Sequence, residues 1–167
     1  MPKAPFTEAE VELLIASPKV VFAKMEDNRG QPNVQEVRLT YEIRKKAYSE
    51  ERLRLRVFAR LENRPNSAVV QAFPGVSLLW YNHRIRCIAW KLKREVVQNM
   101  TVIGVVRGWY EHQWTDTDQD KFVIDVNAEI SHTDFNSVLR TCLRRWNIED
   151  PDGQLNLGEV NYEHNSH

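Results

Sequence analysis

The chain has 167 residues, of which 42% are hydrophobic and 28% are charged, and its formal net charge is zero. A chain of this length and composition buries enough apolar surface to fold as one domain without a disulfide or a metal. No run approaches the ~20 apolar residues of a membrane-spanning helix, which argues against a membrane protein, and the lack of an apolar leader after Met1 predicts a cytoplasmic location.

The first predicted element is a helix over Glu8–Ala16. Thr7 has the position of its N-cap, and Glu10, three residues later, completes a capping box. Phe6 and Val11 have the spacing of a hydrophobic staple, which fixes the angle at which the chain enters the helix. The sequence therefore places the start of this helix at the residue after Thr7.

An apolar, β-branched stretch over residues 19–25 predicts either a short strand or another helical turn, and residues 26–33 predict a loop. Two runs of alternating apolar and polar residues follow, at 37–43 and 53–61, joined by a polar connection over 45–51. Strict period-two alternation predicts two half-buried antiparallel strands. One face is apolar and must be covered, while the other face carries Arg38, Arg44, Arg52, Arg54, Arg56 and Arg60.

Five more strands are predicted between residues 67 and 126, with a turn at Pro74-Gly75 and a bend at Asn82-His83. The third of the five has apolar residues on both faces, as a strand that is covered on both sides would have. The predicted strands are residues 67–73, 76–81, 84–93, 101–107 and 122–126.

After residue 130 the apolar period changes from two residues to 3.6, which predicts a second helix. Thr133 is its predicted N-cap, with Asp134 in the first turn, and arginines near its C-terminal end suit the helix dipole. We expect this helix to cover the apolar face of the sheet. Its apolar stripe consists of Phe135, Val138, Leu139, Cys142, Leu143 and Trp146.

These elements predict an α+β fold, in which a twisted antiparallel sheet of about six or seven strands has two helices packed on one face. Residues 1–150 are expected to form a single α+β domain. Residues 151–167 are predicted to be a polar tail that could add one edge strand and whose end is disordered. The two cysteines, Cys87 and Cys142, lie within apolar patterns and are predicted to be buried free thiols.

The zero net charge conceals an asymmetry along the chain. Residues 1–107 contain 19 Lys and Arg against 11 Asp and Glu, whereas residues 108–167 contain 4 against 12. Two interpretations are open. Either the two halves interleave in the fold and neutralise each other, or a basic face is open to an acidic partner.

An aromatic cluster over residues 107–114 is one candidate for chemistry. Together with a histidine from an earlier strand end, it contains the two proton-transfer groups that metal-independent cleavage of RNA requires, and Arg107 or Arg84 would bind the phosphate. The alternative is that aromatic residues near strand ends pack in the core or at its rim. The candidate catalytic residues are His83, His112, Glu111 and Tyr110.

The arginine face of the predicted hairpin is the second candidate. Its guanidinium groups, with Phe58 among them, suit a phosphate backbone and a stacked base, and tryptophans offer further stacking surfaces. The alternatives are an acidic protein partner, self-association into a homo-oligomer, and an ordinary solvated sheet face. The candidate binding residues are Arg38, Arg44, Arg52, Arg54, Arg56, Arg60, Arg107, Trp109 and Trp114.

Asp116, Asp118 and Asp120 have the spacing of the first three ligands of a calcium loop. The match then fails, because Lys121 occupies the position that requires glycine and Asn127 the position that requires glutamate. We therefore predict a solvated acidic turn, and we expect neither a metal nor a cofactor.

A short opening helix, a lysine soon after it, a β region, an aromatic strand that ends in tryptophan and a last helix follow one another along residues 6–148. This order resembles an uncharacterised family of small bacterial and phage domains. Family members tend to carry further histidines on the aromatic strand, and residues 102–106 have none. The resemblance implies a prokaryotic or phage origin and no particular activity. The matching residues are Lys19, His83, Gly108, Tyr110, Trp114 and Arg145-Trp146-Asn147-Ile148.

The expected function is a non-enzymatic binding module that contacts nucleic acid or an acidic protein through the arginine-rich sheet face. One alternative is a small metal-independent ribonuclease-like enzyme that uses the histidine, glutamate and tyrosine cluster. The other is a self-assembling structural subunit.

Overall fold

The computed structural model describes residues 5–32, 36–46, 52–63, 69–130, 134–155 and 162–163, with the backbone alone described at 60–63, 69–73 and 162–163. These residues form a mixed α+β fold with two helices and nine strands. The elements are α1 (Glu8–Ala16), β1 (Lys19–Asp27), β2 (Glu36–Lys45), β3 (Leu53–Asn63), β4 (Val69–Trp80), β5 (His83–Gln98), β6 (Thr101–Thr115), β7 (Gln119–Asp125), α2 (Phe135–Arg145), β8 (Ile148–Glu149) and β9 (Tyr162–Glu163).

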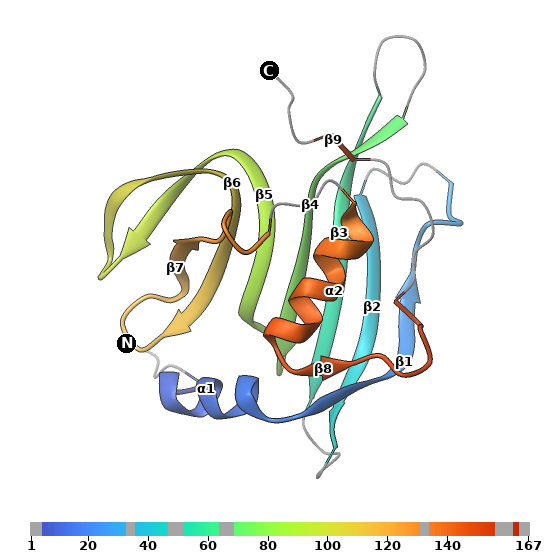
Figure 1. Ribbon diagram of the computed structural model, residues 1–167, viewed down its shortest axis with the longest axis horizontal. Coiled ribbons are helices and arrows are strands. Elements are labelled where there is room, and N and C mark those ends of the chain that lie inside the picture. Colours follow the sequence, from blue (N-terminus) through green and yellow to red (C-terminus); the bar gives the residue numbers. More distant parts are fainter. Residues whose placement is uncertain are drawn as a thin grey trace.

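The strands form one curled sheet in the order β7-β6-β5-β4-β3-β2-β1-β8, and β9 pairs with β4 (Figure 1). Each strand from β1 to β7 pairs antiparallel with the next, whereas β8 joins β1 and β9 joins β4 in parallel. The sheet is larger than predicted for two reasons. The stretch over residues 19–25, for which a strand or a helical turn was open, is the nine-residue strand β1, and the chain after α2 returns to the sheet twice through two-residue strands that are too short to produce an alternating pattern.

The predicted hairpin is confirmed as β2 and β3. The apolar residues of the two strands face each other in register, as in the pairs Leu39 with Val57 and Ile43 with Leu53, and all four of these side chains are buried. The alternation therefore gives the hairpin one apolar face and one polar face, because the intervening polar residues point to the opposite side of the sheet.

The sheet has a face that we call the inner face, because its buried side chains form one core cluster with the apolar stripe of α2. Figure 1 shows α2 lying in front of the central strands. The helix begins one residue later than predicted, because Asp134 rather than Thr133 is the N-cap and its carboxylate accepts a hydrogen bond from the Asn136 amide. Thr133 itself lies outside the described residues.

The predicted turn at Pro74-Gly75 is wrong, since both residues lie inside the continuous strand β4. The pairing of β4 with β3 shifts register between Phe58 and Arg60, which forms a bulge that accommodates a proline without an N–H donor. Gly75 is required there because the Phe58 ring crosses it, and a Cβ at Gly75 would lie 2.3 Å from the ring.

Strands β5 and β6 are much longer than predicted. Residues 91–98 and 101–108, which we call the arm, extend past the residues of β5 and β6 that pair with β4 and β7. The arm ends in a two-residue turn in which Asn99 and Met100 have φ values of 53° and 62°, as in a type I′ hairpin. Figure 1 shows the arm arching away from the central strands.

The tip of the arm is attached to the turn between β6 and β7. Asp118 accepts hydrogen bonds from the backbone amides of Asn99, at 2.8 Å, and Met100. A second, smaller apolar cluster lies on the outer face of the sheet, opposite α2, and contains Cys87, Ala89, Val106, Tyr110 and Val123. Strand β5 is therefore covered on both faces, as its sequence predicts.

Within the described residues, neither helix has the length and apolar composition that crossing a membrane would require.

Candidate functional site

The outer face brings part of the predicted arginine surface next to aromatic residues. The successive pairings of β3 with β4, of β4 with β5 and of β5 with β6 align residues in two rows that cross the sheet. The first row contains Phe58, Gly75, Ala89 and Tyr110, and the second contains Arg56, Ser77, Cys87 and His112. Because alternate residues of a strand share a face, Arg54 and Arg56 lie on the same side of the sheet as Phe58.

Some cations on this face have acidic partners within the fold. Arg38 lies 3.9 Å from Glu26, and Arg44 lies 3.3 Å from Glu42. The Arg44 guanidinium also lies 3.3 Å from the centroid of the Phe22 ring. These contacts give Arg38 and Arg44 a structural use at the β1–β2 side of the sheet.

Other cations make no ion pair with any residue that the structure describes; these are Arg54, Arg56, Lys91 and Arg94. The Nε atoms of Arg56 and Arg94 are enclosed by protein and have no hydrogen-bond acceptor there. An enclosed polar atom without a partner carries a desolvation penalty. These two guanidinium groups therefore each keep one unsatisfied donor among the described residues.

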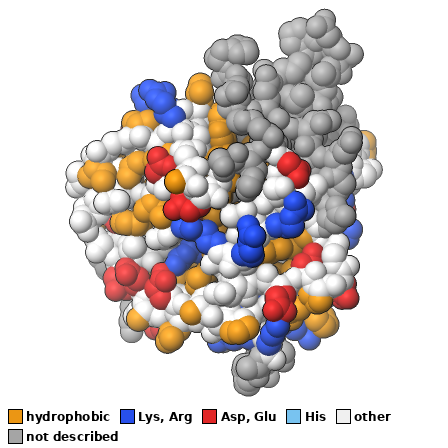
Figure 2. Space-filling model, viewed as in Figure 1, with side chains coloured by type: hydrophobic (Ala, Val, Ile, Leu, Met, Phe, Trp, Pro, Cys, Tyr) orange, Lys and Arg blue, Asp and Glu red, His pale blue; other side chains and the backbone are white. Residues whose placement is uncertain are grey.

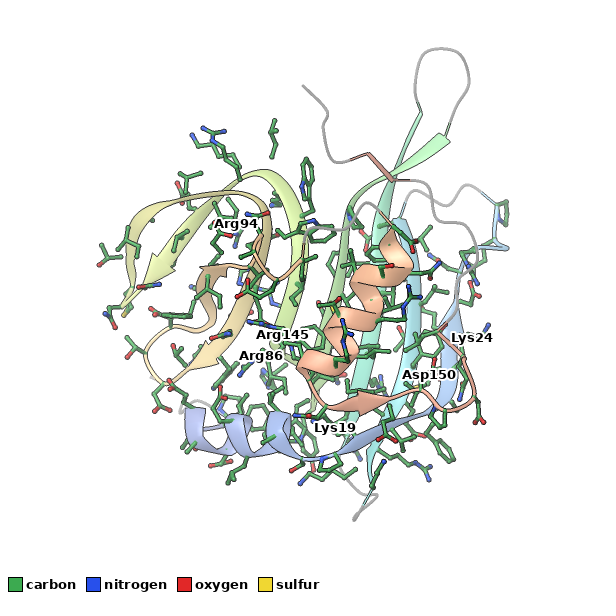
Figure 3. All side chains as sticks on the ribbon, viewed as in Figure 1. Lys19, Lys24, Arg86, Arg94, Arg145 and Asp150 are labelled. Carbon is green, nitrogen blue, oxygen red and sulfur yellow. The ribbon has the colours of Figure 1, made fainter. Side chains whose placement is uncertain are left out.

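Burial shifts the pKa values of His112 and Tyr110 on this part of the face. Burial is the main cause that lowers the pKa of His112 to about 3, and the charges of Arg84 and Arg94 lower it further. Burial also raises the pKa of Tyr110 to about 12. The Arg94 guanidinium lies 5.7 Å from the centroid of the Tyr110 ring, and Figure 3 shows Arg94 beside the arch of β5. His112 is therefore neutral at physiological pH and adds no charge.

A groove lies between β3 and the base of the arm. Its volume is about 570 Å³, within the roughly 300–1,000 Å³ of typical ligand sites. Phe58 and Tyr110 supply aromatic surface, and Lys91 and Lys93 supply charge. The full lining is Glu36, Phe58, Ala89, Trp90, Lys91, Leu92, Lys93 and Tyr110. We call this surface, together with Arg94 and with Arg56 and Arg54, which precede Phe58 on the same face of β3, the cationic groove.

The structure places the remaining predicted binding residues elsewhere. Trp109 and Trp114 belong to the core cluster of the inner face and are only 4% and 3% exposed. Arg107 is exposed and lies two residues before the inward-facing Trp109 in β6, so that it points away from the groove. Arg52 lies against Tyr81 at the β4–β5 turn, with 6.0 Å between guanidinium and ring. The side chain of Arg60 lies outside the described part of the chain.

The two candidate catalytic histidines lie on opposite faces of the sheet. His83 is exposed, and its ring lies 5.6 Å from Phe6 and 6.2 Å from Trp114, which belong to the core of the inner face. His112 is buried on the outer face, 5.4 Å from the Tyr110 ring. The two imidazoles therefore cannot act on one scissile group without a rearrangement of the sheet.

Glu111, the candidate acid or base, points to the inner face and is 1% exposed. Its Oε2 atom accepts hydrogen bonds from Arg145 Nε and Trp146 Nε1, both at 3.0 Å. Its Oε1 atom accepts hydrogen bonds from Arg145 Nη2 at 2.9 Å and from Gln113 at 2.6 Å. Both carboxylate oxygens are therefore engaged in attaching α2 to β6.

The three aspartates with calcium-loop spacing have separate roles. Asp116 accepts a hydrogen bond from the Glu8 amide at the start of α1, Asp118 holds the arm, and Asp120 pairs with Arg84 at 3.1 Å. In the part of the chain that the structure describes, no group of His, Cys, Asp and Glu could hold a metal ion.

Sequence reasoning missed the contribution of the arm to the groove. Lys91, Lys93 and Arg94 follow the point where apolar residues stop covering both faces of β5. Lys91 and Lys93 were predicted only as the end of the strand over residues 84–93, and Arg94 lay just beyond it. The basic run Lys91-Leu92-Lys93-Arg94 was the available signal. Its distance from Phe58 and Arg56 in the sequence concealed the fact that they share a face.

Figure 2 shows the face that carries α2, where basic side chains gather over the middle of the view. Two exposed arginines of α2, Arg140 and Arg144, lie on this side of the molecule. They hydrogen-bond to Ser137 and Thr141 within their own helix. They provide a second basic surface. Among the residues that the structure describes, this surface has no groove lined by aromatic side chains.

Two residues of the resemblance, Lys19 and Asn147, have structural roles at the end of α1. The Lys19 ammonium donates hydrogen bonds to the carbonyls of Leu14, Ile15 and Ser17, at 2.6–2.9 Å. The Asn147 side-chain amide donates to Ile15 at 2.9 Å. Comparison of the chain with family models, with curated proteins and with solved structures gives no match.

Proposed function

We propose that this protein is a non-enzymatic binding module that contacts nucleic acid through the cationic groove on the outer face of its sheet. The observation that carries the proposal is that Arg56, Lys91 and Arg94, which form no ion pair with a residue that the structure describes, lie near the aromatic side chains of Phe58 and Tyr110, with Arg54 further along the same face of β3. Phosphate oxygens would supply the acceptors that these guanidinium groups lack.

The aromatic residues favour nucleic acid over an acidic protein. An acidic peptide would be attracted by the same charges, but it would have no specific use for a partly exposed phenylalanine ring beside Arg56. A nucleobase has a flat π-face that stacks on such a ring. The ribonuclease alternative has less support, because the imidazoles of His83 and His112 lie on opposite faces.

The test is a binding titration with a labelled oligonucleotide of mixed sequence at ~50 mM salt. Arg54→Gln with Arg56→Gln removes two charges beside the groove, and we expect it to weaken binding roughly tenfold or more, because each lost phosphate contact removes counterion release. The matched control is Arg140→Gln with Arg144→Gln, which removes the same charge from α2 and should change affinity less than about twofold.

Two results would contradict the proposal. One is equal weakening by both double variants, which would show a response to net charge alone. The other is binding of the wild-type protein to polyglutamate but to no oligonucleotide, which would identify an acidic protein as the partner.

A further inference from the structure

We infer that the cationic groove takes an unpaired nucleobase, so that the ligand is a single strand of DNA or RNA and not a duplex. This inference rests on the proposed function and specifies its substrate class. It is carried by the position of the Phe58 ring, by the shape of the groove and by the arrangement of charges around it.

The far end of the Phe58 ring lies over Gly75 of the neighbouring strand. Gly75 pairs with Phe58, and the ring occupies the place where a Cβ of residue 75 would be. The Cβ of Ala89 on the next strand is also close to this position. Part of the ring is therefore covered by the sheet, while the partly exposed remainder of the ring lines the groove.

The groove is a local hollow that is closed by the sheet below and bounded by the base of the arm. Its volume of about 570 Å³ suits a small planar group. The bases of a duplex are stacked and paired inside the helix, so that their flat faces cannot reach a ring at the bottom of such a hollow. An unpaired base can turn out of the strand and stack there.

The charges lie where the backbone of a bound single strand would pass. Lys91 and Lys93 line the groove on the arm side, and Arg56 lies in the row next to Phe58 on the other side. A single-stranded nucleic acid that places one base on Phe58 would thus have cations near its phosphates on both sides of that base. Tyr110 completes the hydrophobic floor and stays uncharged, because its pKa is raised to about 12.

The experiment compares ligands with equal numbers of phosphates. A fluorescein-labelled single-stranded dT12, an abasic 12-mer with the same backbone, rU12 and a blunt 12-base-pair duplex are titrated with the full chain at ~100 mM salt. We expect dT12 and rU12 to bind at least about fivefold more tightly than the abasic strand, since base–aromatic stacking typically provides that much or more. We also expect both to bind more tightly than the duplex.

Phe58→Leu keeps an apolar side chain on Gly75 but removes the flat ring. It should abolish the difference between dT12 and the abasic strand while leaving affinity for the abasic strand unchanged. The matched control is Phe22→Leu, which removes an aromatic ring that also lies beside an arginine but is far from the groove in the sheet order. That control should keep the difference.

The outcomes separate the two proposals. Equal affinity for base-bearing and abasic strands, or preference for the duplex, would overturn the inference about an unpaired base and leave nucleic-acid binding intact. Binding of none of the four ligands would remove the proposed function, and the inference with it. The ligand comparison uses the wild-type protein and so does not depend on the folding of a variant.

Discussion

The carboxylate of Glu111 and the guanidinium of Arg145 form a two-point contact, with Arg145 Nε and Nη2 lying 3.0 and 2.9 Å from the two carboxylate oxygens. Figure 3 shows Arg145 at the end of α2 that lies toward β5 and β6. The contact joins the basic C-terminal end of the helix to β6, the strand next to the edge strand β7. Glu111, which the sequence suggested as a general acid or base, thus attaches α2 to β6.

Glu111→Gln is therefore expected to destabilise the fold. The substitution leaves the Arg145 charge without its partner and removes an acceptor from Trp146, and breaking such a buried pair typically costs about 3 kcal/mol or more. The free energy of unfolding in urea measures the effect.

The control for this prediction is Glu149→Gln, since the Glu149 side chain is 64% exposed in its ion pair with Lys46. An exposed pair contributes little, and the change should stay within about 0.5 kcal/mol. Equal stability of the Glu111→Gln variant and the wild type would show that the contact does not hold α2.

His112 is expected to make stability depend on pH. Burial lowers the pKa of His112 to about 3 in the folded state, whereas an unfolded histidine has a pKa near ~6.5. Between these values the unfolded chain binds one more proton, so that stability falls as pH decreases from about 6.5 toward about 3. At pH 5 this loss should be about 2 kcal/mol relative to pH 7.5.

The measurement is urea unfolding at pH 7.5 and pH 5.0 of the wild type and of His112→Gln, which should lose about 2 kcal/mol less than the wild type over this interval. His83→Gln, at an exposed histidine, should retain the pH dependence of the wild type. An identical pH dependence of all three proteins would mean that His112 is protonated in the fold.

The attachment of the arm by Asp118 can be tested by hydrogen exchange. Asp118→Ala removes the acceptor for the amides of Asn99 and Met100, and we expect these two amides to exchange roughly tenfold faster or more, because local opening no longer breaks their hydrogen bonds. Asp116→Ala serves as the control, since Asp116 binds the Glu8 amide instead. Unchanged exchange at Asn99 and Met100 in Asp118→Ala would contradict the attachment.

Lys19 is expected to stabilise the end of α1. Its ammonium is fully buried and donates to three carbonyls, and burial lowers the pKa of this lysine to about 8. Lys19→Met keeps the length of the side chain and removes all three donors, which should destabilise the fold by about 3 kcal/mol at pH 7. Lys24→Met, at a side chain that is 48% exposed, should change stability by less than about 0.5 kcal/mol. If Lys19→Met changed the free energy of unfolding by as little as Lys24→Met, the hydrogen bonds of Lys19 would not stabilise the end of α1.

The sequence was most informative where one local rule decided the structure. Thr7 and Glu10 predicted the start of α1, and the alternation around Leu39 and Leu55 predicted the hairpin and its buried face. In each case the relevant partners are a few residues away or follow from the period of the strand. No long-range information was needed.

Prediction failed where the deciding partner was distant. The glycine at position 75 indicated a turn, but its reason is the Phe58 ring on the neighbouring strand. Glu111 indicated chemistry, but its partners are on α2, 34 and 35 residues later. The cationic groove likewise joins β3 to the base of the arm, and no period in the sequence could reveal that relation.

The salt dependence of oligonucleotide binding tests the central claim most directly. For single strands, the logarithm of the binding constant falls with the logarithm of salt concentration by about 0.7 for each phosphate neutralised. The account predicts a steep slope for the wild type and a slope about 1.4 shallower for the variant that carries Arg54→Gln and Arg56→Gln. Equal slopes for the two proteins, or a wild-type affinity that does not change with salt, would contradict it.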